Sequence, residues 1–215
     1  MKYEIVRYGV LMKLIERDLG VVRFFLKNDF AIAIDAFHRA SKADNDKAGI
    51  CSLFRMIFPL IDHVAQLVRG RKGDNGNALT QYIRNNMGEV NELYKRSAGM
   101  IVFIYRHGLL HQIQPKRIEH NGSIVEWNIF YREEGSSHLS VKSEGEKKKR
   151  LYFDVENFAS DFLESIERLE VQLKNDKKLR DNFMNAAKEM SKPLSTAEQK
   201  KKDKWLTQQD FEILK

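Results

Sequence analysis

Hydrophobic residues in the first half of this chain recur at three- and four-residue intervals, the spacing of one face of an α-helix. This period predicts helical stretches over residues 3–19, 21–43, 48–68, 78–87 and 90–111. Only 3 Pro and 12 Gly occur in the 215 residues, which argues against a loop-rich β-sandwich. The first half of the chain is therefore expected to fold as helices.

Three local signals divide these helical stretches. Gly20 is expected to stop the first helix, and Pro59 is expected to kink or interrupt the third because proline lacks a backbone N–H donor. Residues 70–77 are rich in Gly and Asn and predict a loop. The helix over residues 90–111 is apolar on nearly all sides around residues 98–105, so we expect it to be the central, buried one.

The hydrophobic period changes to two residues after Pro115, where Val125, Trp127, Ile129 and Tyr131 alternate with mostly polar residues. Two shorter strands are expected, over residues 139–141 and 151–153. Since parallel strands need a long crossover, the three strands predict a small antiparallel β-meander within residues 116–153.

Asp154 is expected to cap a long helix that runs to about Met190, and Pro193 follows it. Ser195 and Glu198 have the spacing of a capping box, so a last short helix should begin there. The predicted fold is mainly α, a helical bundle of four to five core helices with the meander inserted before the last long helix. We expect one helical domain over residues 1–192 and a C-terminal helical appendage over residues 193–215.

The composition is that of a soluble globular protein, with 42% hydrophobic and 31% charged residues and a net charge of +7. The single cysteine, Cys51, excludes an internal disulfide framework and any multi-cysteine zinc site. We find neither a signal peptide pattern nor an apolar stretch of the ~20 residues that would span a bilayer. We therefore expect a cytoplasmic protein that does not insert into membranes.

Arg106, His107 and His111 follow directly on the most apolar helix. At about 100° per residue, His107 lies about 100° and His111 about 140° around the helix from Arg106, so all three share one edge. Arginine offers a rigid fork of donors to phosphate oxygens, and histidine exchanges protons near neutral pH. With the neighbouring Lys116 and Arg117, this edge predicts a phosphate-binding site.

Four residues separate Arg106 from His111, and the polar His107 directly follows the arginine. This pattern resembles the Arg-x(4–6)-His motif of the HEPN superfamily. The family often has Asn where this chain has His107. The resemblance covers residues 48–111 and, more loosely, extends to Leu173. It implies a helical bundle that commonly dimerises; many members are metal-independent ribonucleases of toxin–antitoxin and other defence systems, and others are inactive binding modules.

In such a ribonuclease, His111 would act as base or acid, Arg106 would stabilise charge on the phosphate, and His107 would orient the phosphate or supply the second proton-transfer group. The resemblance implies no cofactor and no metal. Its expected partners are RNA, a second copy of the chain and an antitoxin or other protein. In a dimer, the two motifs would lie face to face. The helix over residues 90–105, together with Phe24, Phe25 and Phe54, supplies the apolar surface expected for that dimer.

Asp62 lies within a strongly apolar helix and is expected either to pair with Arg106 and orient it, or to face solvent. Two other interpretations of the motif remain open. Its cations would merely cap the end of a helix, or His107 and His111 would bind zinc.

Basic residues form two further tracts, over residues 142–150 and 192–204, each with five basic residues against two acidic ones. Lys147, Lys148, Lys149 and Arg150 in the first tract are candidate nucleic-acid contacts, although solvated surface is the more ordinary role of such tracts. His38, His120 and His138 are expected at the surface. A Gly-rich phosphate loop, a nucleophile elbow and a dinucleotide fingerprint are all missing from the sequence, so no nucleotide cofactor is expected.

Overall fold

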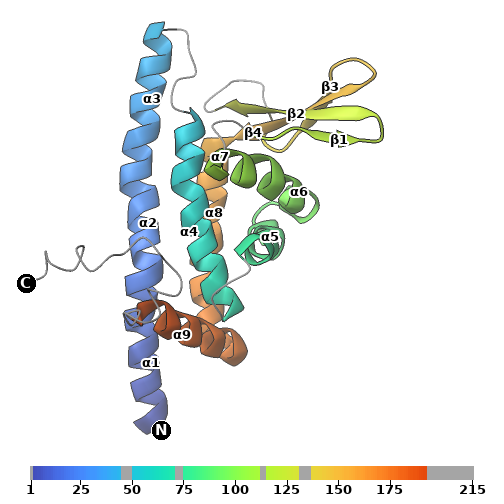
Figure 1. Cartoon of the computed structure of the whole chain (residues 1–215). Coiled ribbons are helices and arrows are strands. Elements are labelled where there is room, and N and C mark those ends of the chain that lie inside the picture. The colour runs from blue at the N-terminus through green and yellow to red at the C-terminus, as the bar shows by residue number, and fades with distance from the viewer. Residues whose placement is uncertain (1, 45–49, 71–74, 112–114, 131–136, 193–215) are drawn as a thin grey trace, which may run out of the picture.

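A computed structural model of the chain describes residues 2–44, 50–70, 75–111, 115–130 and 137–192. The fold is mainly helical, as predicted, and a small four-stranded sheet lies near one end of the helices (Figure 1). The expected appendage over residues 193–215 lies outside the described residues.

A single uninterrupted helix forms the first 43 described residues, so the predicted stop at Gly20 is wrong. Gly20 keeps helical dihedral angles (φ −60°, ψ −43°). One glycine inside a helix costs only about 1 kcal/mol, and burial of the neighbouring Leu19 and Val22 offsets this. Two π-helical turns lie within this long helix, whose segments are α1 (Lys2–Ile15), η1 (Glu16–Gly20), α2 (Val21–Phe25), η2 (Leu26–Phe30) and α3 (Ala31–Asp44).

Helix α4 (Ile50–Arg69) is the central helix of the fold and runs through Pro59 without interruption. Pro59 is exposed, so its ring does not disturb the packed face of the helix. Among the described residues, α4 is the one helix long and apolar enough to cross a membrane. Because 56% of its apolar window is buried inside the fold, α4 has the character of a core helix of a soluble protein.

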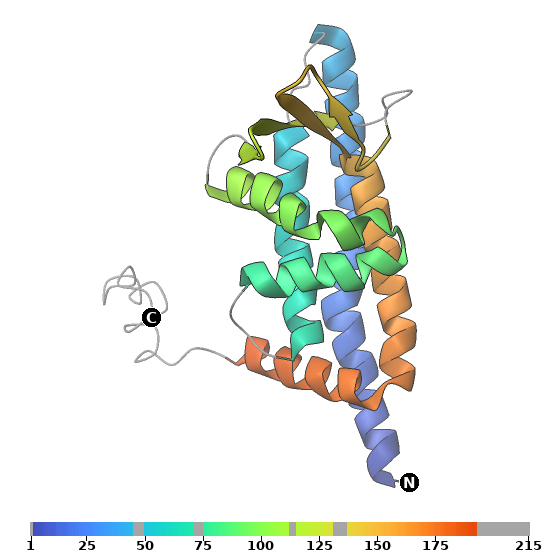
Figure 2. The ribbon, with the colours of Figure 1, turned by 90° about the vertical axis from the view of Figure 1, so that its right-hand side faces the viewer.

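The remaining helices cross the first ones instead of completing a single bundle. Figure 2 shows the long N-terminal helix, α4 and α8 (Val155–Asn175) running in one direction, with α5 (Asn75–Asn85) and the α6–α7 helix across them. The short η3 (Met87–Glu89) precedes α6 (Leu93–Ile101), which continues through the π-helical η4 (Val102–Arg106) into α7 (His107–His111). The expected bundle of four to five helices is therefore not confirmed.

Asp154 caps the last part of the helical fold, as predicted: its side chain accepts hydrogen bonds from the backbone N–H groups of Glu156 and Asn157. The helix expected to reach Met190 is instead two helices. Asp176 adopts an extended conformation, ends α8 and caps α9 (Lys177–Ser191) through the N–H of Leu179. α9 therefore turns away from α8 and lies across α4 and the long helix (Figure 2).

The sheet is mixed, so the predicted antiparallel meander is wrong. Its strand order is β1-β2-β4-β3, and β2 and β4 pair in parallel. Residues 131–140 connect β2 to β3, and β3 does not pair with β2. The position next to β2 is taken by β4, which returns antiparallel to β3 and therefore runs parallel to β2. β1 is a strand that the sequence did not predict. The strands are β1 (Ile118–His120), β2 (Ser123–Phe130), β3 (Val141–Ser143) and β4 (Lys148–Asp154).

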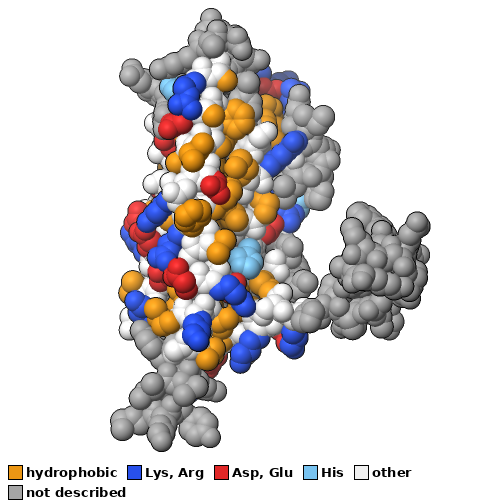
Figure 3. All heavy atoms as spheres, turned by 90° about the vertical axis from the view of Figure 1, so that its left-hand side faces the viewer, with side chains coloured by type: hydrophobic (Ala, Val, Ile, Leu, Met, Phe, Trp, Pro, Cys, Tyr) orange, Lys and Arg blue, Asp and Glu red, His pale blue; other side chains and the backbone are white. Residues whose placement is uncertain are grey.

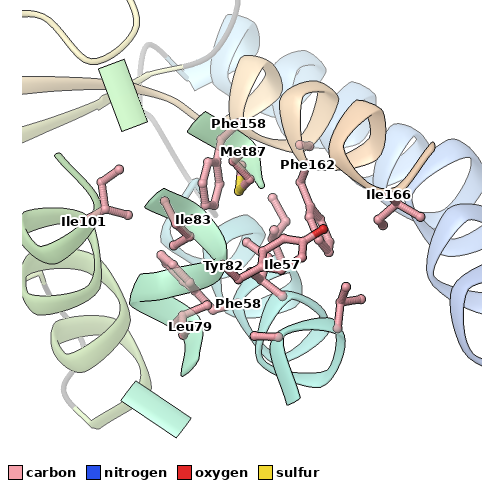
Figure 4. Close-up of a cluster of buried hydrophobic side chains, with 14 of the residues drawn as sticks. Ile57, Phe58, Leu79, Tyr82, Ile83, Met87, Ile101, Phe158, Phe162 and Ile166 are labelled. Atoms are coloured by element: carbon pink, nitrogen blue, oxygen red, sulfur yellow. The ribbon is translucent and has the colours of Figure 1, made fainter. Parts of the chain in front are cut away.

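Phe153, at the end of β4, joins the sheet to the helices. Its ring centroid lies 5.0 Å from that of Phe54 on α4, 4.6 Å from Tyr105 on η4 and 4.9 Å from Phe158 on α8. All four residues are fully buried. Next to this aromatic cluster, apolar side chains of α4, α5, α6 and α8 interdigitate (Figure 4). Phe58 of α4 is one of them and connects this group to the aromatic cluster. The core is thus continuous from the sheet to α8.

The outer face of the long helix carries hydrophobic side chains that the fold leaves uncovered (Figure 3). Val21, Phe24 and Ile32 are 63%, 63% and 67% exposed. Phe54, which was expected to add to an exposed aromatic surface, is instead fully buried. We call the exposed set formed by Val21, Phe24 and Ile32 the apolar stripe.

His138 does not lie freely at the surface as predicted, but is half-buried and part of a hydrogen-bond chain. Its Nδ1 accepts the backbone N–H of Asp154 at 3.0 Å, so Nε2 carries the proton and donates to the Tyr94 hydroxyl at 2.8 Å. Tyr94 in turn donates to Asp161 at 2.9 Å. This chain connects α6 and α8 to the segment before β3.

Burial lowers the pKa of His138 from 6.5 to about 4. Between these pH values, the unfolded chain binds a proton that the folded chain does not, so the free energy of unfolding falls as the pH falls, by up to about 1.4 kcal/mol per pH unit. We predict that His138→Gln, which is neutral at every pH, loses this part of the pH dependence. Urea unfolding of both proteins from pH 7 to pH 4 checks it; identical slopes would contradict the prediction.

Candidate functional site

Arg106 ends η4, and its position follows from the burial of Tyr105 beside it. The Tyr105 ring is fully buried and stacks on Phe54 of α4, with ring centroids 5.4 Å apart. Because the next residue points in a different direction, Arg106 comes to the edge of the core facing α4. Only 12% of the Arg106 side chain remains exposed.

Asp62 on α4 meets Arg106 at this edge. The Nε and Nη2 atoms of Arg106 lie 3.3 and 3.1 Å from Oδ2 of Asp62. The carboxylate side chain is only 11% exposed, so the expectation of a pairing is met and the alternative that Asp62 faces solvent is wrong. This contact links two helices whose residues are 44 positions apart.

Burial raises the pKa of Asp62, and the positive charge of Arg106 partly opposes this shift. The other carboxylate oxygen, Oδ1, is buried and has no hydrogen-bond partner among the described residues. Removing either charge would leave the other one buried and unpaired, which is strongly unfavourable.

His107 completes the described part of the site. Its Nδ1 lies 3.3 Å from Nη1 of Arg106. Because arginine only donates, Nδ1 accepts and the proton of a neutral ring is on Nε2. That nitrogen faces the start of α5, where a Cβ on Gly76 would lie 3.8 Å from it. A Cβ at this position would be in ordinary van der Waals contact with the imidazole ring.

The contacts of Arg106 leave donors for a further ligand. Those with Asp62 and His107 use three of the five N–H groups of a guanidinium. None of these three contacts goes to a carbonyl of its own helix, as the capping interpretation would require. In this respect the arrangement favours a binding site over a helix cap.

His111 lies at the end of α7, one turn beyond His107, but its side chain is outside the described residues. The end of α7 is held by Arg55 of α4, whose Nε donates to the carbonyl of Leu109 at 2.9 Å. Sequence reasoning missed Arg55. The signal was present, because Arg55 lies seven residues before Asp62 and therefore on the same face of α4.

The basic residues predicted to bind nucleic acid are partly neutralised within the sheet. Glu126 pairs with Arg117, Lys148 and Arg150, at 3.4, 2.7 and 3.8 Å. Glu144 also pairs with Lys148 and Arg150, at 3.7 and 2.8 Å. These hydrogen bonds and charges lower the pKa of Glu126. Lys147 and Lys149 are exposed on the same hairpin.

Lys116 contacts the helix that carries Arg106 and His107 (η4 and α7), which we call the motif helix: its Nζ is 5.3 Å from the centre of the Phe103 ring. In the second basic tract, the described Lys192 pairs with Glu189, and residues 193–204 lie outside the described residues. No group of three or more potential metal-ligating side chains occurs among the residues that the structure describes.

Comparison with known proteins adds no relative: no protein-family model, no curated protein and no solved structure matches the chain. Interpretation of the site therefore rests on its own geometry and on the motif.

We predict that Asp62→Asn lowers the free energy of unfolding by about 2–3 kcal/mol, because it leaves the Arg106 charge buried without a counter-charge. Glu164→Gln is the matched control. It breaks the Arg168–Glu164 pair, whose side chains are 48% and 50% exposed, and should cost less than about 1 kcal/mol. Chemical denaturation of the three proteins measures both effects. Equal losses would show that the buried Arg106–Asp62 pair contributes no more to stability than the exposed Arg168–Glu164 pair.

Proposed function

We propose that this chain is a HEPN-like, metal-independent endoribonuclease of a defence or toxin–antitoxin system. The observation that supports this most is the ion pair of Arg106 with Asp62. The helix of Arg106 also carries His107 and, one turn further, His111. An arginine fixed beside one histidine, with a second histidine one turn further along the helix, is suited to phosphate-ester chemistry without a metal.

In the proposed reaction, one histidine takes the proton of an RNA 2′-hydroxyl, and the 2′-oxygen attacks the adjacent phosphorus. The bond from phosphorus to the 5′-oxygen breaks, and the other histidine protonates that oxygen. The products are a 2′,3′-cyclic phosphate and a 5′-hydroxyl end. Arg106 stabilises the charge on the pentacoordinate phosphate, while Asp62 fixes the direction of its guanidinium.

One observation favours the alternative, a non-catalytic module of HEPN-like fold that binds nucleic acid or a protein partner. Arg106 is only 12% exposed and already has a counter-charge. In that case the pair would serve mainly to hold α4 and the motif helix together.

We predict that the wild-type chain cleaves RNA in EDTA and that Arg106→Gln and His111→Ala each reduce the rate by at least about 100-fold. His120→Ala, which changes an exposed histidine of the sheet, is the control and should keep the wild-type rate. Gel analysis of cleavage products, with detection of cyclic phosphate ends, measures this. An inactive wild type would contradict the nuclease and support the binding module.

We further propose that the protein is a cytoplasmic homodimer that also binds an antitoxin or another protein. The exposed apolar stripe on the long helix supports an interface there, since interfaces are enriched in aromatic residues. The long helix and α5–α7 lie on opposite sides of α4 in Figures 1 and 2. A dimer through the stripe would therefore keep the two motifs apart, and each site would have to work within one chain.

We predict a mass of about twice the 25.2 kDa of one chain in light scattering at micromolar concentration. The double variant Phe24→Glu/Ile32→Glu should be monomeric, because it places four carboxylates in the interface of a dimer. Val171→Glu, at a 58% exposed position on α8, should leave the dimer intact. A wild-type monomer, or a dimer that survives the double variant, would contradict an interface at the stripe.

A further inference from the structure

The helix that carries Arg106 and His107 exposes one aromatic ring. Phe103 is 45% exposed, whereas its neighbours Val102, Ile104 and Tyr105 are buried at 4%, 0% and 0%. Phe103 lies four residues before His107, within the π-helical segment η4, so the two side chains occupy successive turns of nearly the same face. The exposed ring therefore lies beside the candidate phosphate site.

Lys116 is held next to this ring by the backbone. The N–H of Lys116 donates to the carbonyl of Ile104 at 2.9 Å, which returns the segment after the motif to the same helix. Its ammonium then lies 5.3 Å from the centre of the Phe103 ring. With the lysine in this place, almost half of the phenylalanine surface is still open to solvent.

Helix α5 supplies a third cation along the same face. Gly99, one turn before Phe103, is exposed, and a Cβ on it would lie 4.0 Å from Nη2 of Arg84. Gly99, Phe103 and His107 thus follow one another along the helix with Arg84, Lys116 and Arg106 beside them. The distance from residue 99 to residue 107 is about 12 Å at 1.5 Å per residue, enough for a short run of nucleotides.

We infer that Phe103 and Lys116 form a nucleotide-binding subsite for single-stranded RNA next to the phosphate site. A base stacks on the Phe103 ring, and Lys116 and Arg84 contact the flanking phosphates. An aromatic platform in a basic groove is the common way to bind single strands, because every base has a π-face. Bases inside a double helix are not free to stack on a side chain, which excludes duplex RNA as the preferred ligand.

This inference rests on the proposed function for its ligand class, but its test does not need catalysis. A fluorescein-labelled 2′-O-methyl oligonucleotide has no free 2′-hydroxyl and cannot be cleaved by the proposed reaction. Fluorescence anisotropy with this probe, single-stranded or annealed to its complement, measures binding to the wild type, Phe103→Ala, Phe103→Tyr, Lys116→Ala and the control Val171→Ala. Val171 is 58% exposed on α8, outside both the motif and the apolar stripe, so it matches the loss of an exposed apolar side chain.

We expect Phe103→Ala to weaken single-strand binding by at least about fivefold, while Phe103→Tyr and Val171→Ala stay within about twofold of the wild type. Lys116→Ala should reduce the slope of log affinity against log salt by about 0.7. Thermal unfolding should be the same for Phe103→Ala and Phe103→Tyr within a few degrees, since the ring is exposed.

The inference is overturned if the wild type does not bind the single strand, if it binds the duplex as tightly, or if Phe103→Ala binds as well as Val171→Ala. Its failure differs from that of the proposed function. If the chain binds the probe through Phe103 but does not cleave RNA, the subsite is supported and the nuclease is contradicted. If Phe103→Ala cleaves RNA as well as the wild type, the nuclease is supported and the subsite is contradicted.

Discussion

The contact of the Phe153 ring with Phe54 and Tyr105 is the interaction on which the rest of the site depends. It fixes the sheet, α4 and the motif helix in one buried aromatic cluster. Since Tyr105 directly precedes Arg106, its burial determines where the arginine leaves the core. Aromatic pairs at these distances contribute about 0.5–1.5 kcal/mol each beyond the burial of their area. The cluster thus helps to bring Arg106 and Asp62 together.

A charge pair held in this way is suited to phosphate binding because its geometry is set before any ligand arrives. Asp62 accepts two of the arginine donors through one oxygen and so fixes the orientation of the guanidinium. A phosphate approaching from the side of His107 would meet donors that already point in a fixed direction. This is electrostatic preorganisation, in which little reorientation remains for the reaction itself.

The sequence allowed the helical half of the fold and the cap at Asp154 to be predicted, because both follow from local patterns. It left the contact of Asp62 with Arg106 as one of two alternatives, since a charge needs a partner only where it is buried. It did not allow three other features to be predicted. Helices continue through Gly20 and Pro59 because tertiary burial outweighs a local helix breaker. β2 and β4 pair in parallel because strand order depends on the path between strands, which no local pattern encodes. The half-buried position of His138 depends on Tyr94 and Asp161, which are distant in sequence.

The central claim, that Arg106 is a phosphate-binding residue and not only half of a structural ion pair, is tested most directly by a crystal structure with an uncleavable 2′-O-methyl RNA. The account predicts a backbone phosphate within hydrogen-bond distance of the Arg106 guanidinium, with His107 and His111 beside it and the Arg106–Asp62 contact intact. RNA bound on another surface, with Arg106 still bonded only to Asp62 and His107, would contradict it.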